Sequence, residues 1–493
     1  MRLSSDLVRR ALSGHAAIGL LAGALLYLIC LSGTLIVVHE EWQRWEQPTV
    51  AESAEIAPAA VQRAASAVLA SEAGKKPTEH FFVHLPNDAL PRTVITTDNQ
   101  AVYVDSDGAV AGPEAHGWTE FLIGLHYYLH LPNTLGLAIV GALGVMMAAL
   151  IVGGVLAHPR IFRDAFTLRA KGPRQLAFAD WHNRLGVWTL PFGLAVAITG
   201  ALLGLSTLIA SGIAATWYDN NVEQVYAPVF GSEPAHNDAH APLANIAGAL
   251  SWMAANRPEV RASYVILHEP GTAGQYLQVM ADHPRRLIFG EYYAFDAAGR
   301  FQRTIGMADG AMGQQLAAST YKLHFGSFGG LPVKLGYMLL GLAASVVSAT
   351  GMSIWLMKRR QRGKPSPKLE GMWSAILWGA PTLIALAFVL RTAAGPEAPM
   401  VALFWAGLAA LIALGILTGD RVRIEMWLRA ALAALMAAIG LIHAGLSIGA
   451  AGTGPLVIDA ALLAGAVLVA LPFWQGRARR TAAMGEAEVL PAE

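Results

Sequence analysis

Residues 15–33 read HAAIGLLAGALLYLICLSG, and residues 182–200 read HNRLGVWTLPFGLAVAITG. The two stretches align without a gap. Each begins with a histidine, has a glycine four residues later, and ends on a hydroxyl residue followed by glycine. Each lies in an apolar run long enough to cross a bilayer as a helix. A repeat of this length predicts a fold built by duplication.

A second pair of segments repeats in the same order. Leu125-His126 is followed by Leu131-Pro132 and Leu135-Gly136. Leu323-His324 is followed by Leu331-Pro332 and Leu335-Gly336, after a gap of two residues. A polar segment precedes each of them. The predicted repeating unit is therefore a membrane helix, an outer domain and a second membrane helix.

Composition supports a membrane protein. Of the 493 residues, 55% are hydrophobic and 14% are charged, and the mean hydropathy is +0.45. Soluble domains carry about 25% charged residues. The net charge of +1 gives no indication of a nucleic-acid surface. The single cysteine, Cys30, excludes an intramolecular disulfide, an iron–sulfur cluster and covalent C-x-x-C-H haem attachment within this chain, and we expect it only to pack.

Eight apolar runs predict eight membrane helices, and short connections rich in Lys and Arg set their orientation. The runs lie near residues 15–38, 134–157, 183–211, 333–357, 373–390, 400–418, 427–447 and 455–474. The basic connections contain Arg2, Arg9 and Arg10; Arg160, Arg163, Arg169, Lys171 and Arg174; Lys358, Arg359, Arg360, Arg362, Lys364 and Lys368; Arg421 and Arg423; and Arg477, Arg479 and Arg480. Eight alternating helices place all five on one side, which the positive-inside rule assigns to the cytoplasm together with both termini.

Two long polar segments then lie outside, and each predicts a small α+β unit. The first has a helix near 57–72, strands near 80–85, 92–97 and 101–104, and a D-x-x-G turn at 105–108. The second has a helix near 242–256, strands near 262–267, 276–280 and 292–295, and a D-x-x-G turn at 296–299. The common order of elements again indicates duplication.

The predicted fold class is an α-helical polytopic membrane protein. It has a duplicated unit of four core helices and two periplasmic α+β domains, followed by four additional helices. The predicted boundaries are 1–39 for the first helix with its cytoplasmic N-terminus, 40–118 for the first outer domain, 119–158 for the second helix, 159–180 for a cytoplasmic loop, 181–212 for the third helix, 213–322 for the second outer domain, 323–358 for the fourth helix, 359–372 for a cytoplasmic loop, 373–475 for the last four helices and 476–493 for a cytoplasmic tail.

Histidines in duplicated positions are the candidate site. His15 and His182 fall at the cytoplasmic side, and His126 and His324 at the outer side. Facing pairs could bind a metal directly, relay protons, or hold a haem iron from both faces of the ring. Haem fits best, because two helices related by a twofold axis supply axial ligands from opposite sides. The sequence therefore predicts two b-type haems whose iron is bound by these four histidines.

Other residues have predicted supporting or competing roles. We expect Gly19, Gly33, Gly186 and Gly200 to let a bulky ring approach the backbone, and Arg9, Arg10 and Arg184 to pair with the inner propionates. His130 and His158 are second-rank ligands, with His130 able to replace His126, and His39 ranks below them. Aromatics near the outer layer could form a docking surface or an ordinary interfacial belt. They are Trp118, Tyr127, Tyr128, Tyr321, Phe325 and Phe328.

Two haems at two depths would conduct electrons across the membrane. The chain has no G-x-G-x-x-G motif after a strand and no P-loop. Its longest cytoplasmic loop is too short for a flavin or nicotinamide domain. The electron donor is therefore expected to be a membrane quinol or a separate protein. Two other hypotheses stay open: a non-enzymatic anchor or sensor whose outer domains bind a peptide or protease, and a transporter.

Several motifs resemble one known family, the PepSY-associated transmembrane-helix proteins. The similar stretches are His15-x-x-x-Gly19, Leu125-His126-Tyr-Tyr-Leu-His130, His158-Pro-Arg-Ile-Phe-Arg-Asp164, Asp180-Trp-His182-Asn, Pro191-Phe192 and Leu323-His324-Phe-Gly-Ser-Phe-Gly-Gly330, within residues 1–362. The resemblance implies PepSY-type outer domains and a di-haem inner-membrane reductase that converts a periplasmic Fe(III)-siderophore to Fe(II). Hard oxygen ligands hold Fe(II) less tightly than Fe(III), so reduction would release the metal. The chain departs from the family at Gly193, where members often carry a histidine, and in the last four helices.

Overall fold

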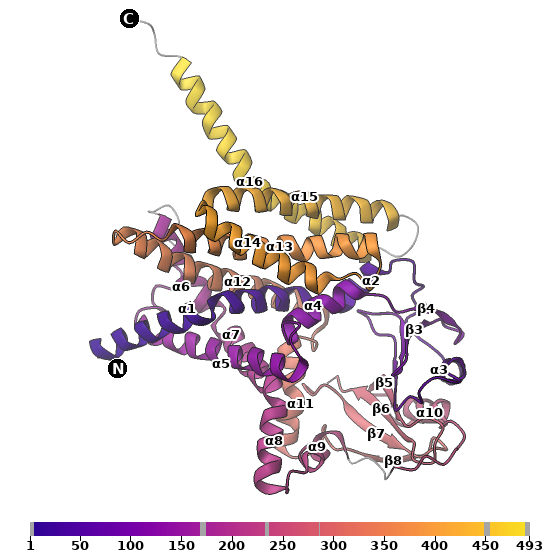
Figure 1. Ribbon diagram of the computed structural model, residues 1–493. Helices are drawn as coiled ribbons and strands as arrows, with labels where there is room; N and C mark the ends of the chain where they lie inside the picture. The colour runs from indigo at the N-terminus through magenta and orange to yellow at the C-terminus, as the bar shows by residue number, and fades with distance from the viewer. Residues whose placement is uncertain (1–3, 168–173, 232–235, 285, 448–453, 489–493) are drawn as a thin grey trace, which may run out of the picture.

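The computed structural model describes residues 4–167, 174–231, 236–284, 286–447 and 454–488. A bundle of membrane helices carries one β-sheet domain at one end, and the N-terminus lies at the other end (Figure 1). Within these ranges, seven helices are long and apolar enough to cross a membrane, and a bent pair adds an eighth span if it counts as one. The spans are α1 (Ser5–Ile36), α5 (Asn133–Ala157), the pair α6 (Arg174–Trp188) and α7 (Leu190–Gly204), α12 (Gly330–Gln361), α13 (Pro367–Ala394), α14 (Met400–Thr418), α15 (Arg421–Ser447) and α16 (Gly454–Glu488). The predicted polytopic fold is confirmed.

The third predicted helix is wrong as a single element. The chain bends by 69° between α6 and α7, and after Leu205 it starts a further helix, α8 (Ser206–Trp217). Pro191 is in the first turn of α7 and has no N–H to donate, so the helical ladder breaks at Thr189. The equivalent helix of the first half, α1, is continuous.

The histidine segments of the second and fourth predicted helices are separate short helices. His126 lies on α4 (Gly117–Tyr127), and His324 lies on α11 (Met312–Phe325). Leu129 and His130 take left-handed backbone angles between α4 and α5, with φ of 54° and 55°. This tight turn redirects the chain before the span begins. The remaining helices are α2 (His39–Glu46), α3 (Pro58–Ser71), α9 (Val222–Phe230) and α10 (Ile246–Asn256).

Each outer segment forms an α+β unit as predicted, and the strands of the two units join in one continuous antiparallel sheet, which the sequence did not predict. The strand order is β4-β3-β2-β1-β5-β6-β7-β8, with α3 and α10 covering the face away from the spans (Figure 1). The strands are β1 (His80–His84), β2 (Thr93–Thr96), β3 (Ala101–Val104), β4 (Val110–Pro113), β5 (Arg261–His268), β6 (Tyr276–Asp282), β7 (Glu291–Phe295) and β8 (Phe301–Thr304). The halves join where β1 pairs with β5, and Phe82 lies opposite Ile266 there. A pseudo-twofold axis therefore passes between these two strands.

The turns at the two D-x-x-G motifs show how closely the halves match. The N–H of Gly108 donates to the Asp105 carbonyl at 3.1 Å, and the N–H of Gly299 donates to the Asp296 carbonyl at 2.9 Å. Both glycines have positive φ, 86° and 78°. A Cβ at either would collide with the backbone of the helix packed against the turn. Only glycine meets both demands.

The last four helices pack against the first half of the core and also contact α12 of the second half, where the Trp373 indole donates to the Ser353 hydroxyl. The indole N–H of Trp118 on α4 donates to the Ile384 carbonyl of α13 at 3.0 Å, and Tyr27 of α1 donates to the Leu377 carbonyl at 2.7 Å. Trp118 is 5% exposed, whereas Leu316, its repeat equivalent on α11, is 65% exposed. The C-terminal helices thus cover one half and leave the equivalent face of the other open.

Candidate functional site

Four histidines meet in two pairs at two depths of the bundle. Nearer the sheet, His126 of α4 faces His324 of α11, with ring centroids 6.2 Å apart and ring planes at 33°. We call this the sheet-side pair. Near the opposite end, His15 of α1 faces His182 of α6, also with centroids 6.2 Å apart but with ring planes at 85°. We call this the distal pair. Each pair takes one histidine from each half of the duplication.

The two pairs lie far apart along the bundle. His15 is on α1 itself, and the His126 ring packs against Gly33 further along the same helix. At 1.5 Å per residue, the helix rises about 27 Å between these two positions. The hydrocarbon core of a bilayer is about 30 Å thick. The pairs therefore lie near the two membrane surfaces.

A backbone carbonyl orients every one of the four rings. The Nδ1 atoms of His15, His182 and His126 lie 2.9, 3.0 and 3.0 Å from the carbonyls of Leu150, Val347 and Ile29. His324 bonds likewise to Val196 and lies 3.0 Å from the Thr199 hydroxyl. Since a carbonyl only accepts, the proton is on Nδ1 and the Nε2 lone pair is available to a metal.

Glycines make room for the rings. A Cβ at Gly33 or Gly200 would lie 2.6 or 2.8 Å from Cε1 of His126 or His324. A Cβ at Gly154 or Gly351 would lie 3.3 or 3.2 Å from Cε1 of His15 or His182. Gly33 and Gly200 thus seat imidazole rings, which differs from their predicted role beside a larger ring.

The other two predicted glycines, Gly19 and Gly186, have open space beside them. A Cβ at Gly19 would meet only Leu150, at 3.8 Å, and one at Gly186 would meet nothing within 4 Å. Gly154 and Gly351 were missed at the sequence level, as were the carbonyl partners of the rings. Nothing in the sequence marks a carbonyl as a ring acceptor, because every residue has one.

The geometry suits one metal ion held between two imidazoles. A metal lies about 2.0–2.1 Å from an imidazole nitrogen. With the ring centre roughly 1.1 Å further, opposed rings would have centroids about 6.3 Å apart, close to the observed spacing. Among the described residues, no group of three or more His, Cys, Asp or Glu side chains could hold a metal ion. The remaining ligands would therefore have to come from the cofactor, as the four nitrogens of a porphyrin do.

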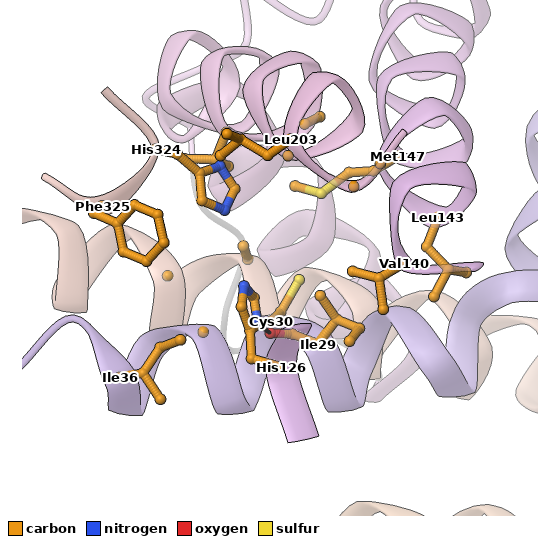
Figure 2. Close-up of a pocket in the computed structure, with 18 of the residues that line it drawn as sticks. Ile29, Cys30, Ile36, His126, Val140, Leu143, Met147, Leu203, His324 and Phe325 are labelled. Atoms are coloured by element: carbon orange, nitrogen blue, oxygen red, sulfur yellow. Dashed lines mark hydrogen bonds between the residues drawn. The ribbon is translucent and has the colours of Figure 1, made fainter. Parts of the chain in front are cut away.

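An apolar cavity of about 300 Å³ surrounds the sheet-side pair. Figure 2 shows His126 and His324 facing each other across it, with Val140, Leu143 and Met147 on one side and Phe325 on the other. Helices α1, α4, α5, α7, α11 and α12 all contribute to its lining. The volume is in the range of small-molecule and cofactor sites. Cys30 lines the cavity too and is the chain's only thiol.

The competing histidines lie elsewhere. His130 turns away from the sheet-side pair, because its Nε2 donates to the Phe121 carbonyl at 2.8 Å and its ring stacks on Phe121. His39 contacts the Ile36 carbonyl beyond the end of α1. His158 follows the last residue of α5 and lines a second cavity near the distal pair.

The predicted arginines separate into two groups. Arg9 and Arg10 pair with Asp6 on the same helix, at 2.6 and 2.7 Å, and are largely exposed, so the structure does not bring them to the distal pair. Arg184 is 4% exposed, and its Nε donates to the Thr167 carbonyl at 2.8 Å. It lies beside the distal pair in the second cavity.

The predicted aromatic group is also divided. Trp118 is buried under α13 and belongs to no docking surface, which corrects its assignment. Tyr127, Tyr321 and Phe325 line the cavity of the sheet-side pair. The Tyr321 and Phe325 rings stack with centroids 4.2 Å apart. Tyr321 is also 43% exposed, so it connects the cavity lining with the surface.

Fold and site together define a duplicated polytopic membrane protein with two paired-histidine sites and one shared sheet. The sequence matches the model of the PepSY-associated TM region over residues 12–358, and the chain belongs to this family. It is also similar to the uncharacterized protein PA4219 of Pseudomonas aeruginosa, at 27% identity over 324 residues, which are 59% of this chain and 79% of that protein. Helices α13–α16 lie beyond the matched region.

Proposed function

We propose that this chain is a di-haem membrane reductase that passes electrons to an Fe(III)-siderophore on its sheet side. One observation carries the proposal. Each of the two histidine pairs is formed by equivalent residues of the two halves, its ring centroids are 6.2 Å apart, and the protein holds the Nδ1 atom of each ring by a hydrogen bond. A haem held at each pair would supply a one-electron Fe(III)/Fe(II) couple. Two such couples near the two membrane surfaces form an electron path.

The side chains have distinct roles in this proposal. His15 and His182 would hold the distal haem, and His126 and His324 would hold the sheet-side haem. Leu150, Val347, Ile29 and Val196 fix the ring orientations through their carbonyls. Hydrogen bonding at the second nitrogen also raises the ligand's electron donation to the metal. The apolar cavity lining would surround a haem held at the sheet-side pair with side chains that offer water few hydrogen bonds.

Orientation and location are part of the same proposal. Of the described residues, Arg160 in the loop after α5 and Lys358, Arg359 and Arg360 in the last turn of α12 lie at the distal end, whereas Arg169 and Lys171 lie outside the described residues. The positive-inside rule would then assign that end to the cytoplasm and the sheet to the periplasm of a bacterial inner membrane. Electrons would enter at the distal pair from a quinol or a separate donor protein. They would leave from the sheet-side pair to a ferric chelate, and the Fe(II) formed would be released from its hard oxygen ligands.

Absorption spectra of the purified full-length protein test the cofactor. We expect a reduced-minus-oxidised b-type spectrum and two haems per chain. His15→Ala and His324→Ala should each remove one haem. His130→Ala is the matched control and should keep both, because its ring bonds to Phe121 outside the pair. A colourless protein would instead favour the anchor or sensor hypothesis, and two haems in both ligand variants would refute the assignment.

Activity is tested separately in proteoliposomes. With the haems reduced chemically, an Fe(III)-siderophore and a chromogenic Fe(II) chelator are added outside. We expect the Fe(II) complex to form as the haem spectrum returns to the oxidised state. His324→Ala should abolish the reaction although the distal haem remains. Fe(II) formation at the same rate in this variant would contradict an exit at the sheet-side pair.

A further inference from the structure

A second cavity, of about 370 Å³, lies at the distal end of the bundle. The loop that follows α5 and the middle of α6 form its walls. The side chains that matter here are His158, Arg160, Ile161, Asp180, Asn183 and Arg184. Its volume is within the range of small-molecule sites. The proposed function above leaves it unused.

Two polar side chains in this cavity are available to a ligand. Among the described residues, neither the His158 ring nor the Asn183 amide has a hydrogen-bond partner. A neutral imidazole offers one donor and one acceptor, and an amide offers both kinds. A ligand with hydroxyl or carbonyl oxygens would satisfy them.

Buried charged side chains of α6 form the cavity wall between His158 and Asn183. Arg184 and Asp180 are 4% and 2% exposed, and their nearest charged atoms are 4.0 Å apart. Arg184 also donates to the Thr167 carbonyl, which ties the loop to α6. A rigid polar wall orients a small ring better than a flexible loop does, because less ordering is needed on binding.

The cavity adjoins the distal pair. Asn183 follows His182 directly on α6, and His158 lies close to His15 and His182. A ligand in the cavity would therefore lie beside the site where electrons enter in the proposed function.

Exposed aromatic side chains border the same region. Phe166 is 88% and Phe162 61% exposed, and Phe166 stacks with Trp188 at a centroid distance of 6.5 Å. Trp188 is 43% exposed and donates to the Ala165 carbonyl at 3.1 Å. Aromatic side chains at the end of membrane spans lie at the lipid interface. An apolar tail leaving the cavity would meet lipid here.

We propose that this cavity binds the headgroup of a membrane quinol, the electron donor of the chain. The proposal rests on the proposed di-haem function. The quinol would be oxidised in two one-electron steps, QH2 + 2 Fe(III) → Q + 2 H⁺ + 2 Fe(II). The electrons would be accepted one at a time at the distal pair, the first being passed on to the sheet-side pair, and the protons would go to water on the same face. Both quinol oxygens exchange hydrogen bonds with His158 and Asn183, and the ring contacts Ile161.

A small-molecule donor fits this region better than a protein donor. Stable protein–protein interfaces bury about 800 Å² on each partner. The feature beside the distal pair is instead an indented cavity with two unpaired polar side chains and an aromatic border. A soluble donor protein is left as an outcome of the test.

Binding is measured first, on the purified full-length protein with its cofactors. The probe is a short-chain ubiquinone, titrated by calorimetry in detergent. We expect Asn183→Ala and His158→Leu to weaken binding about tenfold each, the effect of one lost hydrogen bond to a buried polar group. His158→Gln, which keeps a donor and an acceptor, should weaken it less. Arg163→Gln, on the exposed surface of the same loop, is the control and should bind as the unchanged chain does.

Three results would overturn the proposal: no saturable quinone binding by the unchanged protein, unaltered binding by both cavity variants, or loss of haem from these variants. The last would assign the cavity to the propionates of the distal haem.

Rapid mixing with the quinol supplies the second readout. The cavity variants should slow the reduction of haem by quinol, while reduction by a chemical reductant stays complete. Equal rates in all variants would point to a protein donor. A protein without haem would refute the proposed function, whereas the calorimetric titration measures quinone binding whether or not haem is present. The two failures can therefore be distinguished.

Discussion

The ring of His126 occupies the space that a side chain on Gly33 would fill. A Cβ there would lie 2.6 Å from Cε1 and 3.0 Å from Nδ1 of the ring, and Gly200 stands in the same relation to His324. Four residues before each glycine on the same helix, a backbone carbonyl binds the same ring: Ile29 for His126 and Val196 for His324. The absence of a side chain is thus part of how both imidazoles are aimed.

Replacing these glycines should therefore affect the sheet-side cofactor alone. In Gly33→Ala and Gly200→Ala, the added methyl would displace a ring held by backbone, because contacts below 3.0 Å cannot be accommodated without movement. We expect each variant to lose one of two haems, with the distal spectrum unchanged. Gly212→Ala, where nothing lies within 4 Å, is the control. Full haem content in both variants would show that the rings can shift and still bind.

The two sites should differ in electron paramagnetic resonance. In the proposed di-haem protein, ring planes at 85° would leave the two iron d orbitals that overlap the imidazoles nearly equal in energy, whereas planes at 33° would separate them. We expect a single large-g feature from the oxidised distal haem and a rhombic three-line signal from the sheet-side haem. His15→Ala should remove the first signal and His324→Ala the second. Two identical rhombic signals would contradict the perpendicular arrangement of the distal pair.

Much of this arrangement could be predicted from the sequence. The gapless match of residues 15–33 with 182–200 is enough to predict a duplicated membrane core, which the structure confirms. That match and the two Leu-His segments also predicted which four histidines meet. Equivalent residues of a twofold repeat lie at one depth, so each pair has one member from each half.

Other features depend on details that the repeat obscures. Gly136 and Gly336 differ by 200 in number, but Gly154 and Gly351, which seat the distal rings, differ by 197. Between these glycines α12 is three residues shorter than α5, almost one helical turn, so aligning the two Leu-Pro segments does not show that Gly154 and Gly351 are equivalent. The joined sheet was also missed, because pairing of β1 with β5 depends on how the halves meet rather than on either strand.

His116 should make the junction between sheet and helices sensitive to pH. Burial lowers the pKa of its ring, but the hydrogen bond to Glu114 and the charges of Glu114, Glu120 and Glu46 outweigh burial and raise the pKa above its ordinary value. A raised pKa in the folded state stabilises the protein below about pH 6.5, and this contribution is lost as pH rises through the folded pKa.

The measurement is the melting temperature of the full chain at pH 6 and pH 9. His116→Gln should melt lower than the unchanged protein at pH 6, and the difference should shrink at pH 9, where the ring has lost its charge. Combining Glu114→Gln with Glu120→Gln removes the charges nearest the ring and should flatten the pH dependence by itself. A difference that is the same at both pH values would assign His116 a packing role only.

A buried polar group joins the C-terminal helices to the first half. His443 Nε2 donates to the Trp45 carbonyl at 2.8 Å, and its Nδ1 lies 3.0 Å from Asp459. The Trp45 indole donates to the same carboxylate at 2.8 Å. Asp459 is 2% exposed, so its carboxylate oxygens are shielded from water and are hydrogen-bonded by these two partners instead. Loss of His443 would leave a buried carboxylate with the indole as its partner.

His443→Leu should therefore destabilise the protein by about 3–5 kcal/mol, the range for breaking a buried pair from one side. Adding Asp459→Asn to the same chain should recover part of the loss, because the amide carries no charge to leave unpaired and can still accept the Trp45 hydrogen bond. Heat-induced unfolding in detergent, followed by tryptophan fluorescence, measures both. Asp420→Asn, on a half-exposed turn between α14 and α15, is the control. A double variant less stable than His443→Leu would show that the carboxylate stabilises the junction without its histidine.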